Sequence, residues 1–202
     1  MEEPLFISFE GIDKSGKSSQ VKLLAEYLEK MNYEVVKTCE PGGTRVGQKI
    51  KLILLRPSSQ ISSISEFFLY LADRAEHVRQ VIKLALEARK IVISDRFSDA
   101  TVAYQGYGRG LDIAWIEALN EKATQGILPE ITFLLDINPD LARQRAKKKD
   151  RIEREEIDFH HRVRQGYLEL AKLHPERIKI MNGEGSPKEI HLAIRKIILK
   201  YL

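Results

Sequence analysis

Short runs of apolar residues alternate along the chain with longer segments whose apolar residues recur at helical spacing. The runs are rich in Ile, Val and Phe, and several are nearly continuous, which is typical of strands buried on both faces of a parallel sheet. The predicted strands are Leu5–Glu10, Glu34–Glu40, Lys90–Asp95, Ile131–Ile137 and Ile178–Met181. Because strands and helices alternate, we predict a three-layer α/β/α domain with a five-stranded, mostly parallel sheet.

Three of the intervening helices have clear apolar stripes. The first stripe comprises Val21, Leu24, Ala25, Leu28 and Met31, the second Ile64, Phe67, Phe68, Leu71, Ala75, Val78 and Ile82, and the third Ile190, Ala193, Ile194 and Ile197. Pro187 follows Ser186, which is a good start signal for the last helix. No repeat, low-complexity tract or linker interrupts this pattern. We therefore expect residues 1–202 to form a single domain.

Composition and charge bear on the class of protein, its partners and its cellular compartment. Of 202 residues, 43% are hydrophobic and 31% are charged, as in a globular protein, and the net charge is +4. The basic residues are spread out, with one short cluster at Lys147-Lys148-Lys149, so we expect no nucleic-acid partner. The single cysteine, Cys39, excludes an internal disulfide and favours the cytoplasm. We expect neither a signal peptide nor a membrane span, since no apolar run approaches ~18 residues.

The first predicted strand leads directly into Gly11-Ile12-Asp13-Lys14-Ser15-Gly16-Lys17-Ser18. This is G-x-x-x-x-G-K-[ST] between a strand and a helix, the pattern of a phosphate-binding loop. Its glycines let backbone N–H groups point at one oxyanion, and the helix adds its positive end. In such loops the lysine reaches the β- and γ-phosphates, and the hydroxyl binds magnesium. We predict that these eight residues bind ATP with Mg²⁺.

The loop alone does not separate a kinase from a GTPase or an ATP-driven motor. The chain has no Asn-Lys-x-Asp signature for guanine, and its length leaves little room for a motor's partner-binding apparatus. A nucleotide or nucleoside kinase is favoured. A regulatory or scaffold protein that binds nucleotide without turnover remains the alternative from another class.

Candidate acceptor residues follow the third strand and lie on the long predicted helix over Ser62–Arg89. Asp95 ends a buried strand, where a carboxylate needs a partner, and Arg96 offers a fork that fits phosphate; a structural Asp–Arg pair is the alternative. Tyr70 and Arg74 are four residues apart, so both face one side of a helix. They could stack on a base and bind its edge, or simply form a surface pair.

These residues together resemble thymidylate kinases. The resemblance rests on Gly11–Ser18, Glu40-Pro-Gly-Gly-Thr44, Asp95-Arg96-Phe97, Ala103-Tyr-Gln-Gly106 and Asp150-Arg-Ile-Glu153, whose order and spacing hold over essentially the whole chain. It implies a P-loop kinase fold and transfer of a phosphoryl group from ATP to dTMP, which gives dTDP for dTTP synthesis. It also implies a homodimer, to which the long helix would contribute.

The resemblance assigns acceptor roles by position. Tyr70 occupies the place of the aromatic ring that stacks on thymine, where Phe is more usual, and Arg74 would donate to thymine O4. Cytosine carries an amino group at that position, and such a mismatch can discriminate on the order of 10⁴. The 5-methyl group adds only about 1 kcal/mol, so deoxyuridine monophosphate should be a poorer substrate.

Other positions complete the site that the resemblance implies. Thr101 would read the base edge, Tyr104 would lie under the sugar, and Asp13 would contact the 3′-hydroxyl. Arg96 would hold the monophosphate, and Asp95 would support Mg²⁺ together with Ser18. The remaining acceptor residues would be Glu40 and Gln105.

The cation that stabilises the transferring phosphoryl group is left open between two places. The resemblance puts a mobile lid around residues 139–155, with Arg143, Arg145, Lys147, Lys148, Lys149 and Arg151 as its basic residues. One branch of the family has a basic residue in the phosphate loop, and another has the catalytic cation in the lid. This chain has Lys14 in the loop and a basic lid as well. We take Lys17, Asp13, Lys14, Asp95, Arg96 and Arg145 as the catalytic candidates, and we expect no zinc site among the histidines.

Overall fold

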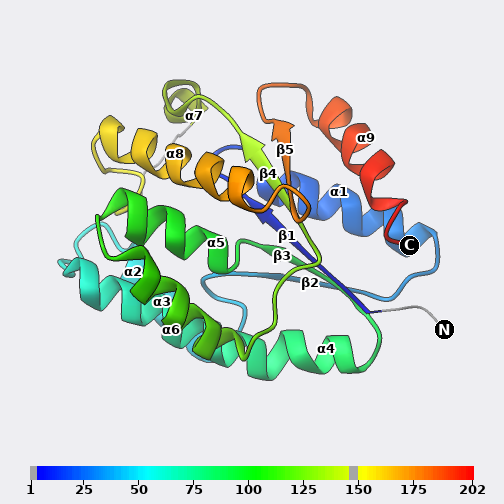
Figure 1. The fold of residues 1–202 in the computed structure, drawn as a ribbon, viewed down its shortest axis with the longest axis horizontal. Helices are drawn as coiled ribbons and strands as arrows, with labels where there is room; N and C mark the ends of the chain where they lie inside the picture. The colour runs from blue at the N-terminus through cyan, green and yellow to red at the C-terminus, as the bar shows by residue number, and fades with distance from the viewer. Residues whose placement is uncertain (1–3, 146–149) are drawn as a thin grey trace.

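The computed structural model describes residues 4–145 and 150–202. All strand pairings in this part are parallel, and the sheet has the order β2-β3-β1-β4-β5 (Figure 1). The strands are β1 (Leu5–Glu10), β2 (Val35–Cys39), β3 (Ile91–Asp95), β4 (Ile131–Asp136) and β5 (Ile178–Asn182). The predicted fold class is confirmed, and the predicted strands differ from these only by a residue or two at their ends.

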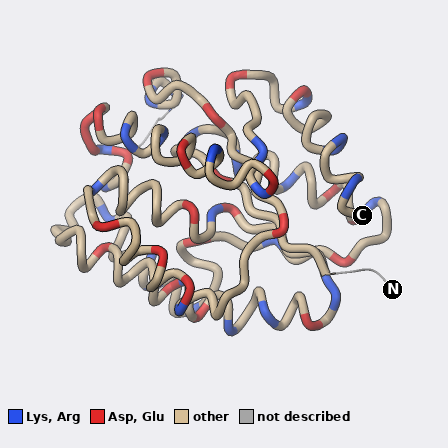
Figure 2. Tube along the Cα trace, in the orientation of Figure 1, with Lys and Arg blue, Asp and Glu red and all other residues tan. Residues whose placement is uncertain are grey.

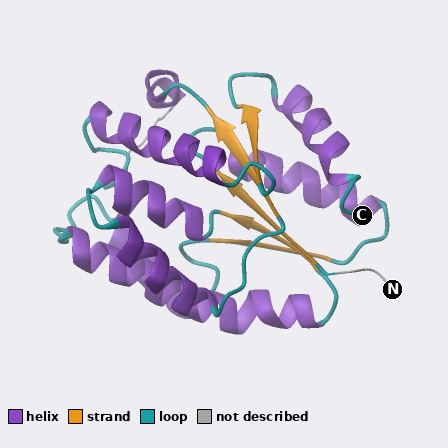
Figure 3. Cartoon of the chain, viewed as in Figure 1, coloured by secondary structure: helices purple, strands orange, loops and turns teal. Residues whose placement is uncertain are grey.

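Helices cover both faces of the sheet (Figure 3). They are α1 (Lys17–Lys30), α2 (Arg45–Leu55), α3 (Ser63–His77), α4 (Lys83–Glu87), α5 (Ser98–Thr101), α6 (Ile113–Thr124), α7 (Pro139–Arg145), α8 (Ile157–Leu173) and α9 (Pro187–Ile198), with π-helical segments η1 (Val78–Ile82) and η2 (Val102–Gly108). The side chain of Ser186 and that of Glu189 cap the start of α9 reciprocally, as the Ser-Pro signal predicts.

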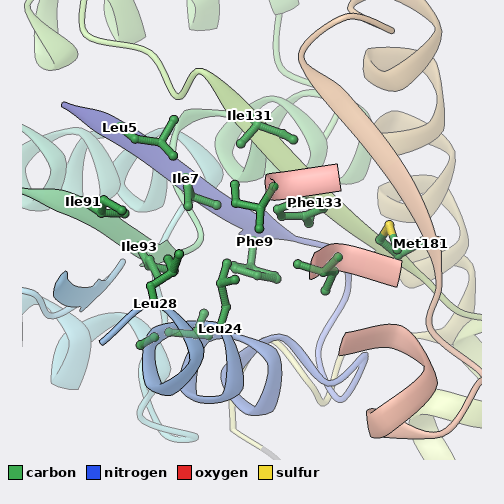
Figure 4. Packing of buried hydrophobic residues seen from close by; sticks show 14 of the residues in the cluster. Leu5, Ile7, Phe9, Leu24, Leu28, Ile91, Ile93, Ile131, Phe133 and Met181 are labelled. Atoms are coloured by element: carbon green, nitrogen blue, oxygen red, sulfur yellow. The ribbon is translucent and has the colours of Figure 1, made fainter. Parts of the chain in front are cut away.

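One apolar core lies between the sheet and the pair α1 and α9 (Figure 4). Ile7 on the central strand has Ile93 on one side and Ile131 on the other, and Leu24 and Leu28 of α1 pack below them. Strands that are buried on both faces explain the continuous apolar runs in the sequence. This packing fixes the carboxyl edge of β1, where the phosphate loop begins.

The second predicted stripe is only partly buried. Phe67 of α3 is fully buried, whereas Phe68 and Ile64 are each 49% exposed. The inner face of α3 instead carries the charged residues Glu66 and Arg74, which are 1% exposed. The functional site therefore takes up a helix face that a simple apolar pattern assigns to the core.

Charged residues of both signs are interspersed along the trace (Figure 2). No helix within residues 4–145 and 150–202 has the length and apolarity needed to cross a bilayer.

Candidate active site

The phosphate loop leaves the carboxyl end of β1 and enters α1. Gly11 and Gly16 have φ angles of 131° and 104°, which favour glycine. Lys17 is buried, and its Nζ atom donates to the carbonyl oxygens of Gly11 (3.1 Å) and Ile12 (2.9 Å). Burial lowers the pKa of Lys17 from 10.5 to about 8. The ammonium group thus sits inside the loop, within reach of a phosphate bound there.

Two oxygen-bearing side chains meet where α1 begins and β3 ends. The hydroxyl of Ser18 donates to the Asp95 Oδ2 atom over 2.5 Å. Mg²⁺ binds through hard oxygens, commonly one or two from the protein together with phosphate oxygens, so this pair suits a magnesium ion carried by a nucleotide. No cluster of three or more His, Cys, Asp and Glu with metal-site geometry occurs in the described ranges.

Arg96 stands between the phosphate loop and the acceptor side. Its guanidinium donates to Gly11 O (2.8 Å), to Asp13 Oδ1 (2.6 Å), and to the hydroxyls of Tyr104 and Tyr167 (3.0 Å each). Burial would raise the pKa of Asp13, but Arg96 and Lys17 outweigh it and lower that pKa from 3.8 to about 2. Asp13 is therefore a permanent anion that fixes the Arg96 fork.

Glu10, the last residue of β1, binds two groups next to Arg96. Its carboxyl group accepts hydrogen bonds from the Phe97 backbone N–H (2.7 Å) and from the Tyr167 hydroxyl (2.8 Å). Full burial, followed by the nearby charge of Asp99, raises the pKa of Glu10 from 4.5 to about 8. Glu10 thus holds the backbone directly after Arg96.

Arg74 is held by an extensive set of hydrogen bonds. Nε (2.9 Å) and Nη2 (2.7 Å) donate to Glu40, and Nη2 also donates to the carbonyl oxygen of Phe97 (2.9 Å). Nη1 donates to Thr101 (2.8 Å) and Asn120 (2.6 Å). All five N–H donors of the guanidinium therefore have protein partners, so donation to a base would share or replace one of these bonds.

A cavity, which we call the acceptor cavity, opens beside Arg74. The predicted acceptor residues meet in its wall, which also includes Leu55, Phe97, Ala100, Asp150 and Ile152; from the prediction it contains Asp13, Glu40, Tyr70, Arg74, Arg96, Thr101, Tyr104 and Gln105. Burial raises the pKa of Tyr70, so its ring enters the cavity with a neutral hydroxyl. Aromatic rings, hydrogen-bonding groups and a guanidinium together suit a planar base attached to a phosphate.

A second cavity lies over the phosphate loop. It shares Asp13, Glu40 and Arg96 with the acceptor cavity, and Lys17, Ser18 and Asp95 line it as predicted. A donor phosphate at the loop and an acceptor phosphate at Arg96 would thus face each other across this common wall.

The basic candidates for the transferring group lie in different places. Lys14 and Arg145 line the cavity over the phosphate loop, and Arg145 donates to the carbonyl oxygen of Lys14 over 3.4 Å. Arg151 points away and donates to the carboxylate of Glu66 and to Leu54 O (2.7 Å). Lys147, Lys148 and Lys149 lie outside the described residues.

Several site residues were not singled out by sequence reasoning. They are Glu10, Lys51, Glu66, Asn120 and Tyr167. Glu10 carried a usable signal, because a carboxylate at the end of a buried strand needs a partner, as was argued for Asp95. The others lie on helices, and their partners are distant in sequence.

Comparison with known proteins agrees with this geometry. The family model described as thymidylate kinase matches residues 9–194. The chain is 46% identical to thymidylate kinase of Maridesulfovibrio salexigens, over 97% of this chain and 95% of the relative. It is 49% identical to that of Kosmotoga olearia, over 96% and 95%. A crystal structure of thymidylate kinase from Ehrlichia chaffeensis superposes with a TM-score of 0.81 at 38% identity, covering 97% of this chain and 99% of that one. The chain therefore belongs to the thymidylate kinase family.

Proposed function

We propose that this protein transfers the γ-phosphoryl group of ATP to dTMP, giving dTDP and ADP. One observation carries the proposal: the phosphate-loop cavity and the acceptor cavity share the wall formed by Asp13, Glu40 and Arg96. Family membership and the aromatic and hydrogen-bonding lining of the acceptor cavity support the choice of substrate.

Positioning and charge neutralisation would do most of the work, since phosphoryl transfer asks little covalent chemistry of the protein. Lys17 would give up its carbonyl partners and bind the β- and γ-phosphates. Arg96, held by Asp13 at 2.6 Å, would bind the dTMP phosphate and align one of its oxygens with the γ-phosphorus. Tyr104, which bonds both of these residues, would support the sugar.

Ser18 and Asp95 would hold the Mg²⁺ that accompanies ATP. Bound there, the ion would neutralise charge on the phosphate oxygens. The support for this assignment is the close approach of the hydroxyl and carboxylate at the rim of the phosphate loop.

The base would be read by Tyr70, Arg74, Thr101 and Gln105. Arg74 is held as a rigid donor array by Glu40 and its other partners, so it suits an acceptor oxygen such as thymine O4. An amino group in that position would meet donor against donor, leaving buried groups unpaired. We therefore expect strong discrimination against cytosine and weaker discrimination against uracil.

Turnover with a panel of acceptors tests the proposal. ADP release would be measured from ATP and magnesium with the monophosphates of thymidine, deoxyuridine, deoxycytidine, adenosine, guanosine and uridine, and with free thymidine. We expect fast turnover of dTMP, slower turnover of the deoxyuridine analogue and negligible turnover of purines. Equal turnover of another acceptor would contradict the assignment, and ATP binding without any turnover would favour a regulatory protein.

Three further assignments belong to the same proposal. Exposed apolar side chains on neighbouring helices α2, α3 and α6 suit a homodimer interface, among them Leu52, Phe68 and Trp115.

The region around residues 139–155 would act as the lid of a single kinase domain. The absence of paired cysteines suits a reducing cytoplasm.

A further inference from the structure

One buried carboxylate on α3 joins three segments that are far apart in sequence. Glu66 Oε1 accepts from Gln105 Nε2 (2.9 Å) and from Arg109 Nε (3.0 Å). Glu66 Oε2 accepts from Arg109 Nη2 (3.1 Å) and from Arg151. Glu66 itself is 1% exposed. Burying a carboxylate so completely is expensive unless it is paired and hydrogen-bonded, and here both oxygens are used.

Arg151 belongs to a turn, Asp150–Glu155, that we call the strap. The backbone N–H of Arg151 donates to Leu55 O (3.1 Å), and the Nε atom of Arg151 donates to Leu54 O (2.7 Å) at the end of α2. The neighbours of Arg151 in the strap, Asp150 and Ile152, line the acceptor cavity, as does Leu55. The anchorage of Arg151 thus fixes one wall of that cavity.

The strap is internally braced and also reaches the phosphate loop. The Asp150 N–H donates to Glu153 Oε2 (3.2 Å), and the Glu153 N–H donates to Asp150 Oδ1 (2.9 Å). The other oxygen of Glu153 pairs with Lys14 at 2.8 Å. The strap is therefore tied together by its own hydrogen bonds and to the phosphate loop by an ion pair, and Arg151 attaches it to Glu66 of α3.

We propose that Glu66 is a positioning residue that holds the strap over the acceptor cavity and, through the same carboxylate, orients Gln105 in the cavity wall. The inference rests on the proposed function in taking dTMP as the ligand of that cavity. Glu66 lines neither cavity, so it acts only through Arg151 and Gln105.

The chemistry of the carboxylate makes the coupling specific. A carboxylate offers acceptors to all its donors, whereas an amide of the same shape presents an N–H₂ group to one of them. In Glu66→Gln the two guanidiniums would lose their shared anion, and at least one donor would face another donor. The strap would then lose its side-chain anchor to α3 while retaining the backbone bond to Leu55 O.

The first test measures dTMP binding without ATP, by calorimetry, in Glu66→Gln. We expect affinity for dTMP to fall by about tenfold or more, as for loss of a hydrogen bond to a charged group, while ATP affinity changes by less than about threefold. Glu76→Gln is the matched control, because it makes the same change on the same helix, at an ion pair with Arg79 that lines neither cavity. This control should bind dTMP as the wild type does.

The second test does not depend on the substrate. Hydrogen exchange at the Arg151 amide in the ligand-free protein should be faster in Glu66→Gln and in Arg151→Gln than in the wild type. The double variant should be no worse than either single variant, since both remove one anchor. If Glu66→Gln does not fold, Arg151→Gln carries both tests, because Arg151 is nearer the surface.

A lower melting temperature with unchanged exchange and unchanged dTMP affinity would overturn the inference, because Glu66 would then only stabilise the fold. Failure of the wild type to phosphorylate dTMP would instead overturn the proposed function. The exchange result would still decide whether Glu66 holds the strap.

Discussion

Lys14 Nζ lies 2.8 Å from Glu153 Oε1, so the phosphate loop and the strap are joined by an ion pair directly beside the cavity over the phosphate loop. The pair raises the pKa of Lys14, chiefly through its hydrogen bond to Glu153. Lys14 also has a φ of 63°, which is uncommon for a residue other than glycine. A cation held in this conformation at the loop is a candidate for contact with the transferring phosphoryl group.

Replacing Lys14 by alanine tests this role. Loss of a cation that acts on the transition state costs on the order of 10²-fold in kcat, so we expect a large fall in turnover with an intact fold. Lys14→Met is the matched control for the aliphatic stem, and it should be equally slow. A fall of less than about threefold would exclude Lys14 from this role and favour a lid cation.

The lowered pKa of Lys17 predicts a pH dependence of ATP binding. Between its folded pKa of about 8 and its ordinary value of 10.5, the ligand-free protein binds fewer protons at Lys17 than the unfolded chain does. The lowered pKa of Lys17 therefore makes the free energy of unfolding of the ligand-free protein rise with pH over that range. ATP needs the charged ammonium, so its affinity should fall by up to about tenfold per pH unit above pH 8.

Calorimetry in two buffers with different ionisation enthalpies measures that linkage directly. Proton uptake on ATP binding should appear above pH 8 and vanish near pH 6. Constant ATP affinity between pH 7 and pH 9.5 would contradict the assignment of Lys17 as a phosphate ligand with a lowered pKa.

Asp95→Asn tests the magnesium site. Replacing a carboxylate by an amide weakens the attraction for a divalent cation, so the Mg²⁺ concentration for half-maximal activity should rise by about tenfold. Glu76→Gln, a change of the same kind at an ion pair on the outer part of α3, should leave the Mg²⁺ requirement unaltered. An unchanged requirement in Asp95→Asn would place the ion elsewhere.

Cys39 lines the cavity over the phosphate loop, so its thiol can report whether a nucleotide binds there. Burial raises the pKa of its thiol above the usual 9.0, so alkylation should be slow at neutral pH and should accelerate as pH rises. ATP with Mg²⁺ should protect the thiol, whereas thymidine alone should not. Mass spectrometry of the modified chain measures both rates, and the absence of protection by ATP would contradict the proposed donor site.

The exposed aromatic pair on α3 and α6 tests the homodimer. Phe68 and Trp115 contact each other edge to face, with ring centroids 5.8 Å apart, yet both remain exposed. A charge at Phe68 would oppose burial in an interface, so Phe68→Asp should shift the protein from dimer to monomer in light scattering. Leu173→Asp, at an exposed leucine on α8, should leave the dimer intact.

The strands and the phosphate loop were predictable because their signals are local. A run such as that of β1 is apolar because both faces of the strand are buried, and the loop directly after it carries its chemistry in eight consecutive residues. The acceptor residues followed from spacing and from the family resemblance. Glu66, by contrast, meets Gln105 and Arg151 only after folding, and no sequence period reports such a contact.

The same argument explains why the second stripe is only partly buried. Phe68 and Ile64 share the apolar character and helical spacing of Phe67, so periodicity cannot tell which of them faces the core. Glu66 and Arg74 instead occupy the buried face of α3, because their hydrogen-bonding partners lie on that side.

The fully bonded guanidinium of Arg74 has a thermodynamic consequence for recognition. A free arginine side chain loses about 2 kcal/mol of rotamer entropy when it is fixed in one orientation. Glu40, Thr101, Asn120 and Phe97 already fix Arg74 when the chain folds. Because Arg74 is already ordered in the ligand-free protein, binding of a nucleotide does not have to order it. A larger share of the contact energy is then retained as affinity.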